Sequence, residues 1–291
     1  MGVPSNRARW AGYLVAALAA AGLVAACGTT GGGKADGVAG VRAASGEFVW
    51  RDLVTSDPAA ARKFYGELLG WTFEETSAFG QPYLLAKQGE RYVGGIVQMP
   101  SGSDRGGSQW LSYMSVGNLD SALGTVEAAG GKRIVGPTEV SGIGRAALVW
   151  DSQGAPVGLA EVDEQSDGMA RGYGNGEFFW MEYLANDVPA ALAFYKGLAG
   201  YEVEAHAAAA VPYYLLKSGT AQAGVFQNPV AGVTPNWLAY VRVADPAALV
   251  AKVPALGGRV LIAPNPGLRD GTLAVIADPT GAVIALQKKS G

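Results

Sequence analysis

Residues 47–71, EFVWRDLVTSDPAAARKFYGELLGW, recur at residues 177–201 as EFFWMEYLANDVPAALAFYKGLAGY. Matching residues of the two copies lie 130 positions apart, as Asp57 and Asp187 do (187 − 57 = 130). Self-similarity at a fixed spacing is the signature of a duplicated structural unit. The chain therefore contains two related halves, and each half is built around this stretch.

The pattern inside each copy predicts a strand, a capped helix and a stop. The aromatic and aliphatic run that opens the copy is typical of a strand. Asp57 precedes the helical pattern, where its carboxylate can accept hydrogen bonds from the first free N–H groups. Gly70 is placed to end the helix. Apolar residues at spacings of three and four predict one buried helix face, formed by Ala60, Ala61, Phe64, Tyr65 and Leu68.

The remaining pattern completes this unit and adds a shorter one. After the first helix come strand-like runs at 72–77, 83–87 and 92–98. The shorter unit has a strand at 110–116, a helix at 119–129 and three more strands. It recurs 127 positions later (237 − 110 = 127), with a helix predicted at 246–256. We therefore predict an α+β fold of four βαβββ units in two tandem pairs.

The first 27 residues are similar to a bacterial lipoprotein signal. Arg7 and Arg9 precede an apolar run at 10–26, as in a secretory signal peptide. Residues 23–27, LVAAC, resemble a lipobox, which implies cleavage before Cys27 and acylation of that residue. The alternative is an uncleaved membrane helix, but the run is short for a span of about 20 apolar residues. We predict a cell-envelope protein, anchored to a bacterial membrane through Cys27 and facing the periplasm or the exterior.

Length and composition divide the rest of the chain. A chain of 291 residues can hold about two domains. After the signal peptide at 1–26, residues 27–46 predict a flexible Gly/Ala-rich tether. Two domains then follow at 47–162 and 176–291, joined by a polar linker at 163–175. The net charge is −3 without a basic cluster, which argues against nucleic acid as a partner.

The phrase W-x-[DE]-x-x-x-x-D-x-x-A-A-x-x-F-Y-x-x-L-x-G-[WY], with the later W-L-x-Y, G-G and D-x-x-G-A, carries a family resemblance. It resembles the glyoxalase/bleomycin resistance/dioxygenase family, also called the vicinal oxygen chelate (VOC) superfamily. The resemblance covers about residues 47–287, in both halves. It implies that two βαβββ units join edge to edge into one curved mixed sheet per domain, with helices on the convex side and a ligand cup inside.

The resemblance also implies where a divalent metal would bind in a family enzyme. A His or Gln in the first strand of a unit and a Glu in the last strand would hold the ion. Gln98 and Gln227 could each offer an amide oxygen, but one neutral ligand does not hold a divalent ion. We therefore expect no metal and no other cofactor. The six matching positions hold residues that cannot ligate a metal: Trp50, Leu111, Gly158, Trp180, Leu238 and Ala285.

Strand parity predicts what lines the cups instead. Side chains two residues apart on a strand share a face, so Asp52 lies with Trp50 and Glu182 lies with Trp180. The result is an aromatic basin with one carboxylate and one phenol per domain. Such a basin suits a small, flat organic ligand, including a cationic one. The alternative is that the tryptophans are packed core and the carboxylates bind backbone groups. The predicted ligand-binding residues are Trp50, Asp52, Gln98, Tyr113, Trp180, Glu182, Gln227 and Tyr240.

These features favour a metal-independent protein that binds or sequesters a small molecule, as the bleomycin-resistance resemblance implies. One histidine, His206, and one cysteine provide no Ser-His-Asp or Cys-His arrangement. A first alternative is a glyoxalase-like lyase or related enzyme that uses Asp52 or Glu182 as a base whose pKa is raised by burial. A second alternative is an envelope interaction protein without a ligand, in which the cups are filled.

Overall fold

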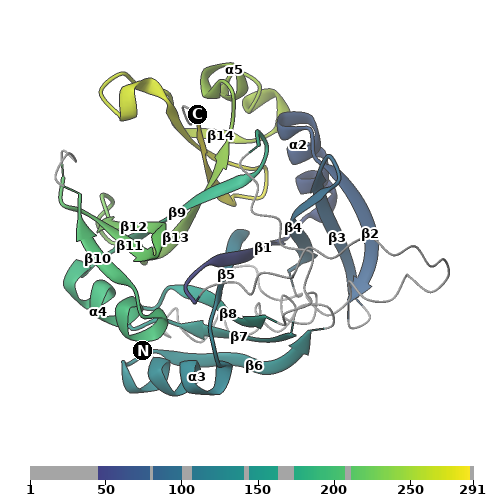
Figure 1. Cartoon of the computed structure of the whole chain (residues 1–291). Coiled ribbons are helices and arrows are strands. Elements are labelled where there is room, and N and C mark those ends of the chain that lie inside the picture. Colours follow the sequence, from purple (N-terminus) through teal and green to yellow (C-terminus); the bar gives the residue numbers. More distant parts are fainter. Residues whose placement is uncertain are drawn as a thin grey trace, which may run out of the picture.

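The computed structural model describes residues 45–78, 81–99, 107–140, 144–162, 174–206 and 211–288. In these residues the chain forms two eight-stranded mixed sheets (Figure 1). The first sheet has the order β2-β3-β4-β1-β5-β8-β7-β6. Its strands are β1 (Phe48–Thr55), β2 (Thr72–Ala78), β3 (Gln81–Gln88), β4 (Arg91–Gln98), β5 (Gln109–Ser115), β6 (Lys132–Val140), β7 (Gly144–Trp150) and β8 (Pro156–Val162).

The second sheet repeats this arrangement as β10-β11-β12-β9-β13-β16-β15-β14. In each sheet the first strand of a unit pairs parallel with its last strand, as β1 does with β4. The two units join through antiparallel pairing of their first strands, β1 with β5 and β9 with β13. The predicted fold of four βαβββ units is confirmed. The strands are β9 (Phe178–Ala185), β10 (Glu202–Ala205), β11 (Tyr213–Ser218), β12 (Thr220–Gln227), β13 (Asn236–Arg242), β14 (Arg259–Ile262), β15 (Leu273–Ala277) and β16 (Val283–Gln287).

The helices begin and end where the caps predict. In α2 (Pro58–Leu69), the side chain of Asp57 accepts a hydrogen bond from the Ala60 N–H at 2.9 Å. Gly70 follows in the left-handed conformation, with φ of 75°. The corresponding helix α4 (Val188–Ala199) repeats both features. The predicted apolar residues of α2 are buried except for Ala60, which is half-buried.

The second helix of each domain differs in length. In the first domain α3 (Leu119–Ala128) matches the prediction closely. In the second domain the predicted helix at 246–256 is broken into α5 (Pro246–Val250) and a 3-10 turn, η1 (Pro254–Leu256). Pro254 explains the break, because proline lacks an N–H and disfavours helical backbone at the residue before it.

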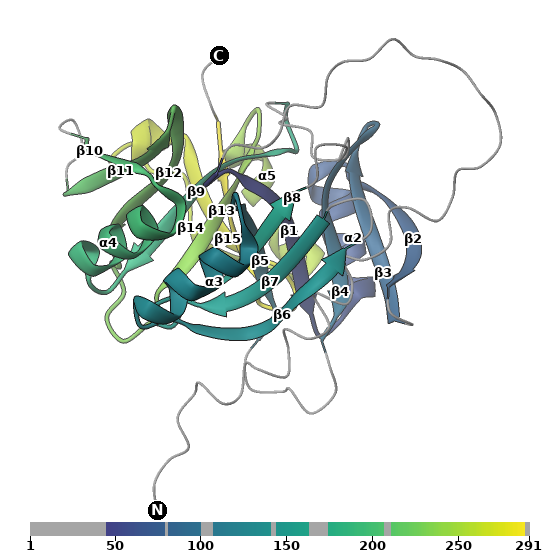
Figure 2. The same cartoon turned by 60° about the horizontal axis from the view of Figure 1, so that its bottom comes forward.

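One hydrophobic core unites the two domains. The face of each sheet that carries the helices, here called the helix face, packs against the helix face of the other sheet. Figure 2 shows α3 beside α4, and these helices are in contact. Trp110 packs edge-on against Phe178 across the interface, with ring centroids 5.2 Å apart. The opposite face of each sheet, here called the cup face, therefore points away from the other domain.

Buried tyrosine–aspartate pairs cross the same interface. The hydroxyl of Tyr65 donates to Asp278 at 3.2 Å, and that of Tyr195 donates to Asp151 at 2.8 Å. The second oxygen of Asp151 accepts from backbone N–H groups of its own turn, including that of Ala155 at 2.8 Å. Each aspartate thus shapes a turn in one domain and holds a tyrosine of the other.

Several predictions concern residues outside the described part of the chain. They are the signal peptide at 1–26, Cys27, residues 28–44 of the tether and residues 163–173 of the linker. Among the residues that the structure describes, no helix has the length and apolar character needed to cross a membrane.

Candidate ligand-binding cups

The first cup is the cup face of the first sheet around Asp52, formed by Trp50, Asp52, Tyr83, Leu111 and Tyr113. Strand β1 places Trp50 and Asp52 on this face, and β3 contributes Tyr83. The Trp50 Nε1–H and the Tyr83 hydroxyl both donate to Asp52 Oδ1, at 2.9 Å and 2.7 Å. The carboxyl group is fully buried.

Burial makes Asp52 an unusual acid. The low-dielectric surroundings raise its pKa from 3.8 to about 6, and the hydrogen bonds from Tyr83, Trp50 and Tyr113 offset this rise only in part. The Tyr113 hydroxyl also interacts with Asp52, and neither this hydroxyl nor Asp52 Oδ2 has another hydrogen-bond partner among the described residues. The first cup therefore contains a carboxyl group that can exchange a proton near neutral pH.

Tyrosine rings occupy the space that a metal site would need. Tyr113 lies over Gly158 on the neighbouring strand, so a Cβ at position 158 would be 2.2 Å from the ring. Position 158 is where the family resemblance places a metal-binding Glu. No cluster of three or more His, Cys, Asp or Glu side chains suited to a metal ion occurs among the described residues. The residues present therefore do not fit the divalent ion that the family implies.

The second cup is the cup face of the second sheet around Glu182, formed by Trp180, Glu182, Tyr213, Tyr240 and Arg269. The carboxylate of Glu182 is buried and accepts from the Tyr213 hydroxyl at 2.7 Å. It also accepts from the Tyr240 hydroxyl and from Nη2 of Arg269. Both oxygens of Glu182 are thus engaged.

Arg269 reaches the second cup from a strained turn, η2 (Arg269–Gly271). Arg269 and Asp270 have φ of 47° and 52°, a left-handed conformation that costs residues other than glycine about 1–2 kcal/mol each. Burial lowers the pKa of Arg269, but the charge and hydrogen bond of Glu182 and the nearby Tyr240 and Tyr213 together raise the pKa above its ordinary value. Because Arg269 neutralises Glu182, the predicted free carboxylate for a cationic ligand is absent from the second cup.

The two cups also differ in exposure. Trp180 and Tyr213 are half-buried. Their first-cup counterparts, Trp50 and Tyr83, are only 8% and 3% exposed. A molecule from solvent can therefore contact the aromatic side chains of the second cup, whereas the first cup is packed in this conformation.

The structure brings together six of the eight predicted site residues. Trp50, Asp52 and Tyr113 lie in the first cup, and Trp180, Glu182 and Tyr240 lie in the second.

The prediction for the other two residues, Gln98 and Gln227, is corrected. Val97 lies on the cup face of β4, so the next residue, Gln98, points to the helix face. Its amide donates to the Ser56 carbonyl at 3.1 Å, and Gln227 binds the Asn186 carbonyl at 3.2 Å. Both glutamines therefore stabilise, by hydrogen bonds, the turn that precedes a helix.

Sequence reasoning missed three residues of the cups. Tyr83 and Tyr213 are 130 positions apart (213 − 83 = 130), so the repeat itself contained a signal for them. Arg269 has no such signal, because the matching position in the first domain is Gly142 (269 − 127 = 142).

The sequence is similar to several known proteins. Residues 180–286 match a family profile described as a glyoxalase-like domain. CFP32 of Mycobacterium bovis, which carries a provisional glyoxylase name, is 32% identical over 244 residues, or 82% of this chain and 93% of CFP32. The anthracycline biosynthesis protein DnrV of Streptomyces peucetius is 30% identical over 256 residues, or 83% of this chain and 92% of DnrV.

Solved structures share the fold at low sequence identity. The Mn(II)-bound glyoxalase from Novosphingobium aromaticivorans has a TM-score of 0.60 at 13% identity, covering 84% of this chain and 82% of the glyoxalase. The 2,3-dioxygenase LapB from Pseudomonas sp. KL28 has a TM-score of 0.60 at 11% identity, with coverage of 86% and 94%. The chain belongs to the glyoxalase/bleomycin resistance/dioxygenase (VOC) superfamily, as a member with two tandem glyoxalase-like domains.

Proposed function

We propose that this protein binds a flat aromatic organic molecule in the second cup, without a metal ion. The observation that carries this proposal is the half-buried pair Trp180 and Tyr213 beside a fully engaged Glu182. A ligand there meets aromatic surface and a polar centre whose charges already cancel. Aromatic pairs contribute about 0.5–1.5 kcal/mol beyond the area they bury, so stacking on Trp180 favours planar compounds.

The names of two relatives support polycyclic compounds as the ligand class. DnrV and the protein DauV of Streptomyces sp. strain C5, 29% identical over 270 residues, are both named anthracycline biosynthesis proteins. Anthracyclines contain a planar, fused aromatic ring system. Such a ring system is the type of surface that can stack on the Trp180 indole.

A titration calorimetry experiment with the anthracycline daunorubicin tests the proposal. We expect binding that is unchanged by EDTA and that weakens about 2–10-fold in Trp180→Phe, since stacking and the Nε1 hydrogen bond to Tyr213 are altered. Trp50→Phe is the matched control in the first cup and should leave the affinity unchanged. A loss in Trp50→Phe alone would place the site in the first cup, and a loss with EDTA would contradict metal independence.

The first cup supports a second function, proton abstraction by Asp52. The pKa of about 6 makes this carboxylate a base near neutral pH, and its Oδ2 has no donor among the described residues other than the Tyr113 hydroxyl. Once Asp52 is protonated, the Tyr113 hydroxyl could donate a hydrogen bond to an oxygen anion formed on the substrate. A substrate would have to displace the packed side chains of the first cup to reach Asp52.

Turnover of the hemithioacetal of methylglyoxal and glutathione tests this second function. We expect activity that survives EDTA, rises with pH through about 6 and disappears in Asp52→Asn. The matched variant Glu182→Gln should retain it, because Glu182 has no free oxygen. An equal loss of turnover in both variants, or no turnover by the parent protein, would contradict catalysis by Asp52 and favour ligand binding as the function.

We further propose that the protein is anchored through Cys27 in a bacterial cell envelope. The support for this proposal is the charged, apolar and small-residue pattern of residues 7–27.

A further inference from the structure

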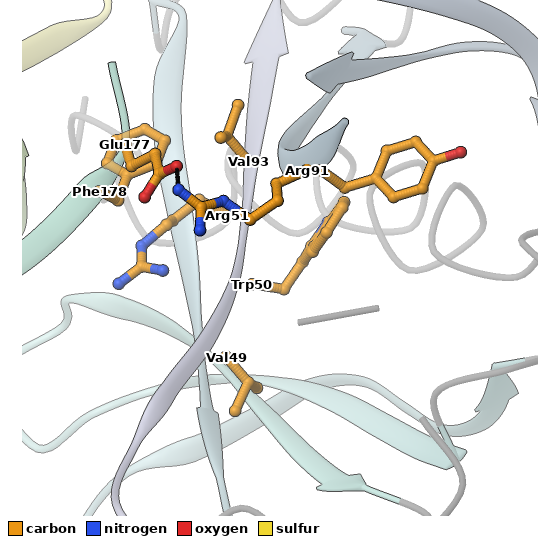
Figure 3. A pocket seen from close by; sticks show the side chains of 8 residues that line it. Val49, Trp50, Arg51, Arg91, Val93, Glu177 and Phe178 are labelled. Atoms are coloured by element: carbon orange, nitrogen blue, oxygen red, sulfur yellow. Dashed lines mark hydrogen bonds and ion pairs between the residues drawn. The ribbon is translucent and has the colours of Figure 1, made fainter. Parts of the chain in front are cut away.

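A small pocket lies between the two domains, beside the first cup, with which it shares Trp50. Arg51 belongs to β1, Arg91 and Val93 belong to β4, and Glu177 and Phe178 lie at the start of β9 (Figure 3). Its volume is about 20 Å³, which is room for roughly one water-sized ligand. Asp52 and Tyr113 do not line it, and neither does any residue of the second cup, so a ligand there would not occupy the binding site proposed in the second cup.

Arg51 has no anionic partner in the described part of the chain. Figure 3 shows its guanidinium beside Phe178, and the guanidinium carbon lies 5.2 Å from the centre of that ring. Its Nε is buried without a hydrogen-bond partner, and its side chain makes no ion pair with the described residues. Burial lowers the pKa of Arg51 to about 10, so the group stays charged at neutral pH.

The carboxylate of Glu177, which also lines the pocket, already has partners for both of its oxygens. The side chain of Glu177 is only 4% exposed and forms an ion pair with Nη2 of Arg91. Its other oxygen accepts from the Gly174 N–H at 2.9 Å. Two guanidinium groups and one carboxylate therefore face the pocket and leave one uncompensated positive charge.

Arg51 is half-buried with its Nε fully buried, so its charge is partly removed from water, and an arginine cannot avoid that cost by losing its proton. The ring of Phe178 supplies part of the compensation, about 0.5–2 kcal/mol in such contacts. We propose that the pocket binds a small inorganic monoanion the size of chloride beside the guanidinium of Arg51. The small volume favours a monatomic anion over larger tetrahedral anions such as sulfate. Because the pocket joins β1 and β4 to the start of β9, the anion stabilises the contact between domains.

Thermal unfolding at constant ionic strength tests this proposal. When sodium chloride replaces sodium gluconate, the melting temperature of the parent protein should rise and then saturate, as for a ligand that binds only the folded state. In Arg51→Met, which keeps an unbranched side chain without the charge, the chloride-dependent rise should disappear. Arg62→Met is the control, because Arg62 forms an exposed ion pair with Glu75 away from the pocket.

A second measurement covers the case in which Arg51→Met does not fold. In chloride-35 NMR the folded parent protein should broaden the chloride line. Added bromide should compete for the site and reverse the broadening, whereas sulfate at equal ionic strength should not. Absence of both the broadening and the chloride-dependent rise in the parent would overturn the proposal. A rise that persists in Arg51→Met would also overturn it.

Discussion

At the scale of single residues, the two cups show how one neighbour changes the chemistry of a buried carboxylate. Asp52 and Glu182 occupy equivalent places, 130 positions apart (182 − 52 = 130). Glu182 is neutralised by Arg269 and bound by two tyrosines, whereas Asp52 has hydrogen-bond donors but no cationic partner among the described residues. Burying a charge without full compensation is unfavourable, so Asp52 makes folding stability depend on pH.

The pKa of Asp52 predicts how stability changes with pH in Asp52→Asn. Below about pH 4 the group is protonated in the folded and the unfolded chain, and the near-isosteric Asn should change stability little. As the pH rises through about 6 the folded group must ionise at a cost, so Asp52→Asn should become the more stable protein. The gain should approach about 3 kcal/mol at pH 8, from a pKa raised from 3.8 to about 6.

Urea denaturation of the parent and of Asp52→Asn at pH 4, 6 and 8 measures this difference. At each pH the stability of Asp52→Asn is compared with that of the parent. If this difference became less favourable to the variant between pH 4 and pH 8, the folded protein would be shown to stabilise ionised Asp52. The matched variant Glu182→Gln should instead be destabilised, because it removes the counter-charge of Arg269.

At the scale of elements, the repeated helices α2 and α4 are specified by their ends. In both, an aspartate side chain accepts from the N–H three residues later, and a left-handed glycine follows the last turn. Both devices act locally, so they keep the helix boundaries at the same places in the two domains although most residues between them differ.

Asp57→Ala should lower the free energy of unfolding by about 1 kcal/mol, because the N–H of Ala60 loses its acceptor. Asp57→Asn keeps an acceptor oxygen and should restore most of the loss. Denaturant unfolding at neutral pH compares the three proteins. An equal loss in both variants would mean that the charge of Asp57, rather than its hydrogen bond, stabilises α2.

At the scale of the whole molecule, the interface between the helix faces makes the two domains one folding unit. Its core is continuous, and the Tyr65–Asp278 and Tyr195–Asp151 hydrogen bonds cross it. Burial raises the pKa of both aspartates, and the tyrosine hydroxyls partly counteract this by stabilising the charged forms. We therefore expect both domains to unfold in one transition.

Tyr65→Phe should lower the unfolding free energy by about 1–3 kcal/mol, since it removes a donor to Asp278 and the acceptor of the Trp110 indole. Tyr195→Phe should cost less, because Asp151 keeps the hydroxyl of Tyr183. Scanning calorimetry should show one shifted transition in each variant. Two separate transitions in the parent protein would contradict a shared folding unit.

The N-terminal prediction concerns the position of the whole molecule in the cell. Cys27→Ser removes the sulfur that would carry an acyl chain, and stable anchoring needs more than one chain. Expressed in a bacterial host, the variant should move to the soluble envelope fraction or remain unprocessed. Membrane fractionation and the mass of the mature N-terminus distinguish these results. A fully processed variant that stays membrane-bound would contradict anchoring through Cys27.

The sequence alone determined the four-unit fold, the ends of α2, α3 and α4, and the pairing of Trp50 with Asp52. These features depend on patterns that act over a few residues: alternation along a strand, spacing around a helix, and capping side chains. The repeat added long-range information, because two copies of one pattern must form two similar units. It also contained Tyr83 and Tyr213, which are recognisable by their common offset.

The tertiary structure alone decided which cup exposes its aromatic side chains, which carboxylate is neutralised and which face Gln98 occupies. Arg269 reaches Glu182 across 87 positions from a strained turn, and the matching position of the first domain holds Gly142 in place of an arginine. The alternation of side chains along β1 places Asp52 but says nothing of Gln98, which lies on a separate strand, β4. The register of β4 is fixed by its pairing with β1. Contacts between distant segments depend on the packing of whole sheets, and no local pattern encodes them.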